Sequence, residues 1–471
     1  MAPLGSALCP PTSSLIFSQS KHQQAFKASS QLQPRNHILK IFCSSFSSSI
    51  NNKPTTVSEV SRSSTTKEPA SFGFKNLTET FWVDVQRAEE RPLRVEVVDG
   101  LFARHVENLA IRVELGNGCA GWGEAAAPEE ENSAVGRAMA KEACEFLRRS
   151  SAMTLGSVFQ EIGGILPGKE YASVRAGVEM ALIDAVANSI DVPLWRLFGG
   201  VSNSLTTAVT IPIRSPAEAS ALAAKYQAKG FTTMRFNLGL NLFEELEVIK
   251  AVQIDQPHCS FILDGNGKYT FEEAILVLER LHEMAVTPIL FEQPVHRDDW
   301  NGLANVRGIA REKYGIHVSA DESCQSLADV QKVVDDDIVD FVNIKLAKFG
   351  VLGSLQAIEI ARQSGLSLVI DSMVETRLAS GFAGHLACGL GCFKYANLDA
   401  PFMLSDDPVF GGYEVSGPVY KYTNARGQGG FLKQDTVAPK FKIQVALASV
   451  ICLSNQVFRR TLHLTILDIV V

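Results

Sequence analysis

Three acidic residues, Asp264, Glu292 and Asp321, lie at the ends of separate short stretches rich in apolar and β-branched residues. If these stretches are adjacent parallel strands about 4.8 Å apart, the three carboxylates converge at one edge of the sheet. Negative charges at such range repel one another strongly unless a cation lies between them. Ligands that are all carboxylate oxygens favour Mg²⁺ or Mn²⁺ over zinc. A single acid of this kind often only caps the next helix, but three in register predict a magnesium site.

Lys345 ends another stretch of the same kind, "VDFVNIK". A buried lysine at a strand end is usually a salt-bridge partner, but beside a metal it is a candidate proton donor or acceptor with a lowered pKa. Polar residues at the ends of two later stretches extend the same edge. These residues are Asp371, Ser372, Glu375, Asn397 and Asp399. We expect them to bind a substrate.

Arg235 and Asn237 share one face of the stretch "TMRFN", whose other face carries Met234 and Phe236. Two polar side chains on a strand that is otherwise expected to be buried indicate a site, and strand order puts them across from Lys345. A guanidinium supplies positive charge but is a poor proton acceptor. The amide of Asn237 neither gains nor loses a proton near neutrality.

Strand-like and helix-like segments alternate through the middle of the chain and must position these residues. The candidate strands are 205–213, 231–237, 260–264, 288–292, 316–321, 339–345, 367–372 and a weaker one at 394–399. The first intervening helix is opened by Ser215 as N-cap with Pro216 behind it and closed by Gly230. A repeat of roughly 24 to 29 residues predicts an α/β fold, a parallel (β/α) barrel of seven or eight units over residues 205–400. A doubly wound sheet is the weaker alternative.

A differently patterned region precedes the barrel. Residues 108–125, "NLAIRVELGNGCAGWGEA", predict a hairpin with Asn117-Gly118 as its turn. Residues 171–200 have the composition and length of helix. We therefore expect an α+β domain over residues 72–204.

The N-terminal 58 residues contain no Asp or Glu, five Lys or Arg, and many Ser and Thr. This composition is typical of an organelle transit peptide, although a disordered tail has a similar one, and we assign residues 1–67 to it. Without these five basic residues the formal net charge falls from −7 to −12. An acidic chain is not expected to bind nucleic acid or an anionic membrane, and no apolar run reaches the roughly 18 residues of a membrane span.

Several motifs follow one another along the chain: "GWGEA", "RAGVEMALIDAV", "LDGN", "FEQPVHRDDW", "ADES", "VNIKLAK" and "DSMVETRLASGFAGH". In their order and spacing the chain resembles the enolase superfamily, muconate-lactonizing subgroup. The match covers roughly residues 76–432. Within the superfamily the chain resembles the L-Ala-D/L-Glu (dipeptide) epimerases, in a plant-type form with a plastid transit peptide.

The resemblance implies an enolase-like barrel with an N-terminal capping domain, to which residues 401–435 return. It implies that Mg²⁺ binds the substrate carboxylate through Asp264, Glu292 and Asp321, and that lysines on both faces of the α-carbon exchange its proton through an enediolate. Lys345 matches one lysine, whereas the Lys-x-Lys motif of the family is Arg235-Phe236-Asn237 here.

Other positions also depart from the family pattern. Asn397-Leu398-Asp399 replaces an Asp-x-Asp that engages the dipeptide ammonium, and Arg104 matches the residue that binds the side-chain carboxylate. Residues 436–471 resemble nothing in the family and form an atypical tail. Barrels of this kind often assemble into symmetric homo-oligomers.

Three functions stay open at this point. Inversion of a stereocentre requires an acid and a base on opposite faces, and loss of one typically costs about 10²- to 10⁴-fold. The first function is a Mg²⁺-dependent dipeptide epimerase, impaired by the Arg-x-Asn pair. The second is a one-base dehydratase or cycloisomerase that relies on Lys345. The third is a non-catalytic paralogue that binds metal and dipeptides.

Overall fold

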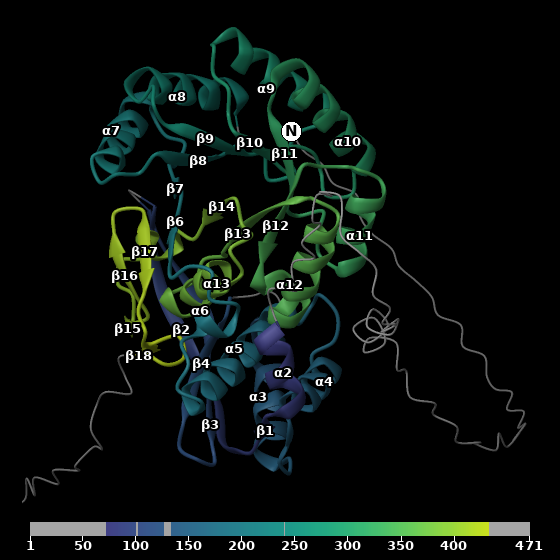
Figure 1. Ribbon diagram of the computed structural model, residues 1–471. Helices are drawn as coiled ribbons and strands as arrows, with labels where there is room; N and C mark the ends of the chain where they lie inside the picture. The colour runs from purple at the N-terminus through teal and green to yellow at the C-terminus, as the bar shows by residue number, and fades with distance from the viewer. Residues whose placement is uncertain (1–71, 100–101, 127–132, 240, 433–471) are drawn as a thin grey trace, which may run out of the picture. The chain divides into compact units, whose positions relative to one another are not determined.

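The computed structural model describes residues 72–99, 102–126, 133–239 and 241–432 (Figure 1). Its largest sheet has eight strands in chain order, and each strand pairs in parallel with the next. The strands are β7 (Val209–Thr210), β8 (Thr233–Asn237), β9 (Ser260–Asp264), β10 (Leu290–Glu292), β11 (His317–Ala320), β12 (Phe341–Lys345), β13 (Ser367–Asp371) and β14 (Tyr395–Asn397). The backbone N–H of Ala208 donates to the Ala396 carbonyl (2.8 Å), which brings the two ends of the sheet together. The prediction of a parallel barrel is confirmed.

Helices connect these strands, and Figure 1 shows α8 to α10 on the outer side of β8 to β11. They are α7 (Pro216–Gln227), α8 (Leu242–Asp255), α9 (Phe271–Glu283), α10 (Trp300–Ile309, continued as a π-helix over Ala310–Tyr314), α11 (Leu327–Asp335), α12 (Leu346–Gln363) and α13 (Arg377–Leu390). Ser215 caps α7 through a capping box with Glu218, as the sequence predicts. None of the helices that the structure describes is both long and apolar enough for a membrane crossing.

The predicted strand 205–213 is wrong, because the chain changes partners within it. Residues Ser204–Thr206 form β6, which pairs antiparallel with β17 (Val419–Tyr422) outside the barrel. The backbone N–H of Thr207 still donates to the Pro418 carbonyl, whereas that of Ala208 donates to Ala396. The sequence could not reveal this switch, since both partners lie some two hundred residues further along the chain.

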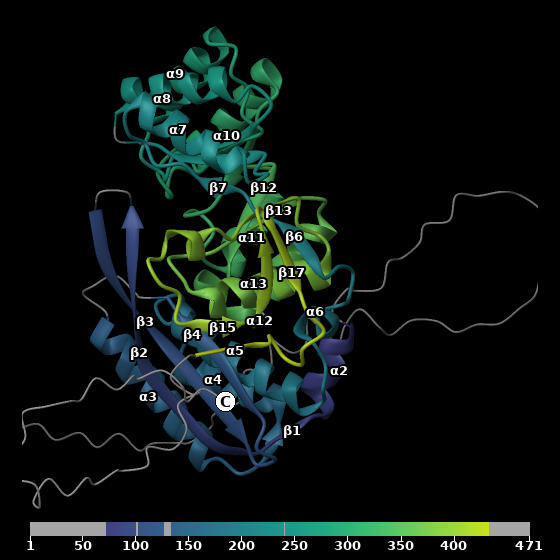
Figure 2. The same cartoon turned by 90° about the vertical axis from the view of Figure 1, so that its left-hand side faces the viewer.

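The region before the barrel combines strands and helices, as expected. Its elements are α2 (Phe72–Thr80), β1 (Trp82–Val83), β2 (Val85–Asp99), β3 (Phe102–Leu115), β4 (Ala120–Ala125), α3 (Ser133–Arg149), β5 (Met153–Thr154), α4 (Leu155–Ile165), α5 (Ala172–Ser189) and α6 (Leu194–Leu197). The predicted hairpin is formed by β3 and β4, with Gly118 at φ 81° in its turn. Figure 2 shows β2 alongside β3, so the hairpin is part of a three-stranded antiparallel sheet.

The C-terminal end of the described region forms short antiparallel strands. They are β15 (Val409–Gly411), β16 (Tyr413–Ser416), β17 and β18 (Gly430–Leu432), preceded by a 3₁₀-helix at Ala400–Met403. Several contacts link this segment to the N-terminal region. For example, the backbone N–H of Ser405 donates to the Glu96 carbonyl (2.9 Å), and that of Leu194 to the Gly427 carbonyl (2.9 Å). The assignments of residues 1–67 to a transit peptide and 436–471 to a tail lie outside the described residues.

Two glycines of β4 let its backbone approach α5 closely. A Cβ added at Gly121 would overlap backbone atoms of Ala181 and Ala185, and one at Gly123 would overlap the carbonyl oxygen of Gly177. This approach explains the "GWG" of the motif "GWGEA". It also places the next residue, Glu124, at the barrel.

We predict that Gly123→Ala strongly destabilises the fold. The new methyl group meets backbone rather than a movable side chain, so the loss of unfolding free energy should reach or exceed the usual overpacking cost of about 1–3 kcal/mol. The urea midpoint measured by circular dichroism tests this. The control is Gly164→Ala in α4, where a Cβ has open space and the helical propensity favours alanine. An equal midpoint for the two variants would contradict the prediction.

Candidate metal and proton-transfer site

One face of the barrel strands changes from apolar to polar along the strand direction. At the beginnings of the strands, a small interior cluster is formed by Ala208, Ile262, Leu290, Phe341 and Val369. Side chains two residues further along point to the same face, because the side-chain period of a strand is two. Those positions include Asp264, Glu292, Asn343 and Asp371. The barrel therefore collects its polar side chains at the C-terminal ends of the strands.

Three buried carboxylates come together at this end. Three carboxylate oxygens, one each from Glu292, Asp321 and Asp371, lie within 4.8 Å of one another. Each of these residues is at most 2% exposed. Asp371 was expected to bind substrate, whereas Asp264 was expected in this trio. Asp264 is fully buried and in register with Glu292, but both its oxygens accept hydrogen bonds from Asn266 (2.8 and 2.9 Å).

Three cations contact these acids. The guanidinium of Arg235 pairs with Asp264, and its Nη2 lies 3.6 Å from oxygens of both Glu292 and Asp371. The other two cations come from the end of β12 and the start of α12. Lys345 Nζ lies 2.5 Å from Asp321 Oδ2 and 3.5 Å from Asp371, and Lys348 Nζ lies 2.5 Å from Asp321 Oδ1.

The acids differ in how strongly they hold protons. Burial raises the pKa of Glu292 well above its usual value, although Arg235 opposes this shift. Burial also raises the pKa of Asp264, again against the effect of Arg235. For Asp321 burial acts in the same direction, but Lys345 and Lys348 outweigh it and hold its pKa below the usual value. Asp321 is therefore the acid that stays most firmly ionised.

The prediction of a lowered pKa for Lys345 concerns the lysine beside a bound metal ion and stays a prediction. The protein groups by themselves act on this pKa in two directions. Burial acts to lower this pKa, but the carboxylates of Asp321 and Asp371 outweigh burial and raise it well above the usual value. Among these side chains Lys345 is held as an ammonium. The sequence indicated the burial of Lys345 but not the number of carboxylates around it.

Three site residues were missed by the sequence reasoning. The amide of Asn343 donates to Glu292 (2.5 Å) and Asp371 (2.9 Å), and its position two residues before Lys345 was the available signal. Lys348 is three residues past Lys345, the spacing of helical neighbours. Glu322 follows Asp321, and burial together with the charge of Asp321 raises its pKa to about 7.

Lys348 lies on the first part of α12, just before a kink in this helix. The helix is interrupted at Gly350, whose φ is 77°, and resumes with the N–H groups of Val351 and Leu352. Both groups donate to Glu179 of α5, at 2.5 and 3.2 Å. The N-terminal region thus caps the second part of α12 while the first part holds Lys348 against Asp321.

The residues expected to bind substrate lie next to these charges. Asn397 is 1% exposed, and neither its amide nitrogen nor its oxygen has a hydrogen-bond partner among the described residues. Asp399 accepts a hydrogen bond from the backbone N–H of Thr210 (2.6 Å). Asp371 accepts one from the N–H of Ser372 (2.7 Å). Burial, together with Glu124 and Asp371, raises the pKa of Glu375 well above its usual value.

Glu124 anchors the loop that carries Ser372 and Glu375. Its carboxylate accepts hydrogen bonds from the backbone N–H (3.0 Å) and the hydroxyl (2.6 Å) of Thr376, the N-cap of α13. Asn108 donates to Glu124 (2.7 Å) and to the Val374 carbonyl (2.9 Å). The "GWGEA" strand therefore positions one wall of the candidate site.

Two predicted residues are exposed. Asn237 ends β8 in register with Asp264, at the mouth of the barrel. Arg104 lies on β3 opposite Val97. Within the described part of the chain, Arg104 forms no hydrogen bond or ion pair with the acidic residues of the site.

The sequence and the fold match those of known proteins. Residues 218–436 match the family described as enolase C-terminal domain-like. An L-Ala-D/L-amino acid epimerase from Populus trichocarpa is 57% identical over 381 residues, which are 79% of this chain and 90% of that protein. The chain belongs to the enolase superfamily.

Further relatives of this enolase-superfamily chain are also epimerases. An aromatic dipeptide epimerase from Herpetosiphon aurantiacus is 33% identical over 325 residues, 68% of this chain and 90% of that protein. The solved substrate-liganded complex of the L-Ala-D/L-Glu epimerase from Bacillus subtilis has a TM-score of 0.67 at 26% identity and covers 74% of this chain and 99% of that one. The resemblance predicted from the motifs is confirmed.

The acidic residues of this enolase-superfamily chain fit a hard divalent cation. All the donors are oxygens, and Glu292 Oε2 is buried with no hydrogen-bond partner among the described residues. Asn343 holds the other oxygen of Glu292, which leaves Oε2 free to act as a ligand. Glu292 and Asp321 belong both to the predicted trio and to the observed one.

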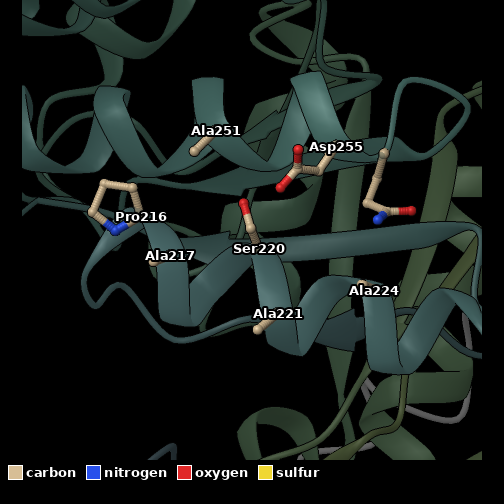
Figure 3. A pocket seen from close by; sticks show the side chains of 8 residues that line it. Pro216, Ala217, Ser220, Ala221, Ala224, Ala251 and Asp255 are labelled. Carbon is tan, nitrogen blue, oxygen red and sulfur yellow. The ribbon is translucent and has the colours of Figure 1, made fainter.

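A groove elsewhere on this enolase-superfamily chain lacks such chemistry. It has a volume of about 650 Å³ and lies between α7 and α8 (Figure 3). Figure 3 shows Ser220 and Asp255 directed into it, and most of the other lining residues are alanines. The reactive groups of the barrel lie instead at the strand ends.

Proposed function

We propose that the protein is a Mg²⁺-dependent epimerase of dipeptides such as L-Ala-D/L-Glu, which acts by α-proton abstraction through an enediolate. The observation that carries the proposal is Lys345, whose largely buried side-chain nitrogen lies between Asp321 and Asp371 at the mouth of the barrel. In its neutral form this amine would accept the α-proton, and in its protonated form it would return it. The Populus relative, named as an L-Ala-D/L-amino acid epimerase, supports the reaction class.

Lys345 would exchange the α-proton on one face of the substrate. An α-proton beside a carboxylate is nearly non-acidic until positive charge stabilises the oxygens. Mg²⁺ held by Glu292, Asp321 and a further acid would supply that stabilisation when bound. Arg235 would bring a second positive charge to the carboxylate. Its fixed guanidinium fork suits a carboxylate but does not accept a proton.

The remaining polar residues would hold the rest of the dipeptide. Asn397 has two buried polar atoms without partners among the described residues, and Asp399 carries a carboxylate beside it. The ammonium group of a dipeptide could donate to the amide oxygen of Asn397 and to the carboxylate of Asp399. Asp371, Ser372 and Glu375 would line the same part of the site.

A second candidate function is favoured by Asn237. Without a titratable group at the end of β8, one proton carrier remains, which suits a one-base dehydratase or cycloisomerase. Such an enzyme would exchange the α-proton on one face without inversion.

An NMR experiment in D₂O with Mg²⁺ and L-Ala-L-Glu distinguishes the functions. Deuterium at the Glu α-carbon together with the second diastereomer supports epimerisation. Deuterium without the second diastereomer supports the one-base enzyme, and no exchange supports a non-catalytic binding protein.

We infer plastid import from composition alone. The acid-free, Ser-rich N-terminal segment supports it. Residues 1–67 fused to a fluorescent protein should direct it to plastids, and a diffuse cytosolic signal would overturn the inference.

A further inference from the structure

We propose that Arg235 competes with the divalent cation for the same carboxylates, and that a substrate carboxylate relieves this competition by giving Arg235 another partner. Metal and substrate would then strengthen each other's binding. The inference concerns the metal site of the proposed function and rests on it.

The first step is the position of the guanidinium. Arg235 Nη2 pairs with Asp264 and lies 3.6 Å from Glu292 Oε1 and from Asp371 Oδ2. These acids come from three strands, β9, β10 and β13. The side chain of Arg235 therefore lies among carboxylates from different sides of the barrel mouth. A Mg²⁺ ion bound by these carboxylates requires Mg–O distances of about 2.0–2.1 Å. It would therefore lie only a few ångströms from the guanidinium.

The second step is charge. Two cations at such range repel each other strongly in a buried site. A lysine could relieve the repulsion by losing its proton, but an arginine cannot, because its guanidinium is not deprotonated in proteins. Arg235 must move, or the metal binds more weakly.

Arg235 also needs another hydrogen-bond acceptor toward which its guanidinium can move. Arg235 is only 9% exposed, and its Nε has no hydrogen-bond partner among the described residues. Such an unmet buried donor is costly. A carboxylate that accepts from Nε and a terminal nitrogen together would satisfy it in bidentate fashion. The substrate of the proposed reaction carries this group.

The consequence is reciprocal coupling. If a dipeptide carboxylate draws Arg235 away from Asp264 and Glu292, those oxygens become available to the metal. By linkage, metal binding must then increase the affinity for the dipeptide by the same factor.

The test measures Mg²⁺ affinity by isothermal titration calorimetry and the melting temperature with and without Mg²⁺. Arg235→Met keeps most of the side-chain volume without the charge, Arg235→Lys keeps the charge without the fork, and Arg311→Gln is the control. Arg311 is an exposed arginine that pairs with Asp340 (3.3 Å) on the outside of the barrel. We expect Arg235→Met to bind Mg²⁺ at least about tenfold more tightly than the natural protein.

The melting temperature separates competition from a merely structural role. Without Mg²⁺, Arg235→Met should melt below the natural protein, because its buried acids have lost a cation. With Mg²⁺ it should show the larger increase, since ligand stabilisation grows with affinity. L-Ala-L-Glu should tighten Mg²⁺ binding to the natural protein by a larger factor than to Arg235→Met, where only direct ligation of the metal by the dipeptide remains. An equal factor in the two proteins would contradict the competition.

The outcomes distinguish this inference from the proposed function. Equal or weaker Mg²⁺ binding by Arg235→Met, with epimerisation intact in the natural protein, overturns only the competition. Tighter binding by the variant without epimerisation in the natural protein overturns only the proposed reaction. If Arg235→Met fails to fold, two other measurements decide: the Mg²⁺ affinity of Arg235→Lys, and the Mg²⁺ affinity of the natural protein with and without L-Ala-L-Glu. The competition is overturned if Arg235→Lys binds Mg²⁺ as the natural protein does and if L-Ala-L-Glu leaves the Mg²⁺ affinity of the natural protein unchanged.

Discussion

Lys345→Met is expected to abolish α-proton exchange. The substitution keeps the unbranched stem but removes the ammonium group that lies 2.5 Å from Asp321 and 3.5 Å from Asp371. Loss of a general acid or base typically costs about 10²- to 10⁴-fold, and the loss should be at the upper end where no second group on that face replaces it. The measurement is the decay of the Glu α-proton NMR signal of L-Ala-L-Glu in D₂O with Mg²⁺.

The control for this prediction is Lys332→Met. Lys332 forms an exposed pair with Asp336 on α11 (2.7 Å), so its loss should leave the exchange rate unchanged. The melting temperature of Lys345→Met must also be measured, because Asp321 and Asp371 lose a neighbouring cation. Exchange by a folded Lys345→Met protein at the natural rate would show that Lys345 is not the proton carrier.

Asn237→Lys is expected to accelerate inversion by about 10²-fold or more, since it adds a proton carrier where the protein has an amide. Asn237 is exposed at the end of β8 and in register with Asp264, so a lysine fits there without disturbing the core. Strand β8 lies across the barrel from β12, which carries Lys345. The new ammonium group should therefore approach the substrate from the other side. The ratio of the two dipeptide diastereomers over time gives the rate.

The matched control is Asn237→Gln, which lengthens the side chain without adding a titratable group. If it raised the inversion rate as much as lysine does, side-chain length rather than proton transfer would be responsible. If Asn237→Lys gave no gain while Lys345-dependent exchange continued, Asn237 would not be the position that limits inversion.

Much of the fold could be predicted because it is encoded locally. Ser215 was predicted to cap α7, and it forms a full capping box there, since capping depends only on residues within one turn. Asn117-Gly118 was predicted as a turn for a similar reason. The prediction of one strand over 205–213 was wrong because neighbouring residues pair with two different strands, first with β17 and then with β14.

The candidate site was predictable only in part. The alternation of side chains along each strand puts Asp264 and Glu292 on the interior face, and this needs no knowledge of the neighbouring strands. Whether Asp264 or Asp371 joins Glu292 and Asp321 depends on side-chain directions. Here Asp371 lies with Glu292 and Asp321, and Asp264 pairs with Arg235 and Asn266. The role of Asp264 as a metal ligand stays a prediction.

The sequence by itself determined the alternating strands and helices, the positions of the acids and of Lys345 at strand ends, and the absence of a lysine at Asn237. These features follow from periodicity and residue chemistry within short segments. Only the tertiary structure decided that Arg235 lies among three acids, that Lys348 and Asn343 join the site, and that the carboxylates of Asp321 and Asp371 raise the pKa of Lys345. The physical reason is that burial and Coulomb interactions are sums over groups from distant parts of the chain, and only the folded barrel brings those groups together.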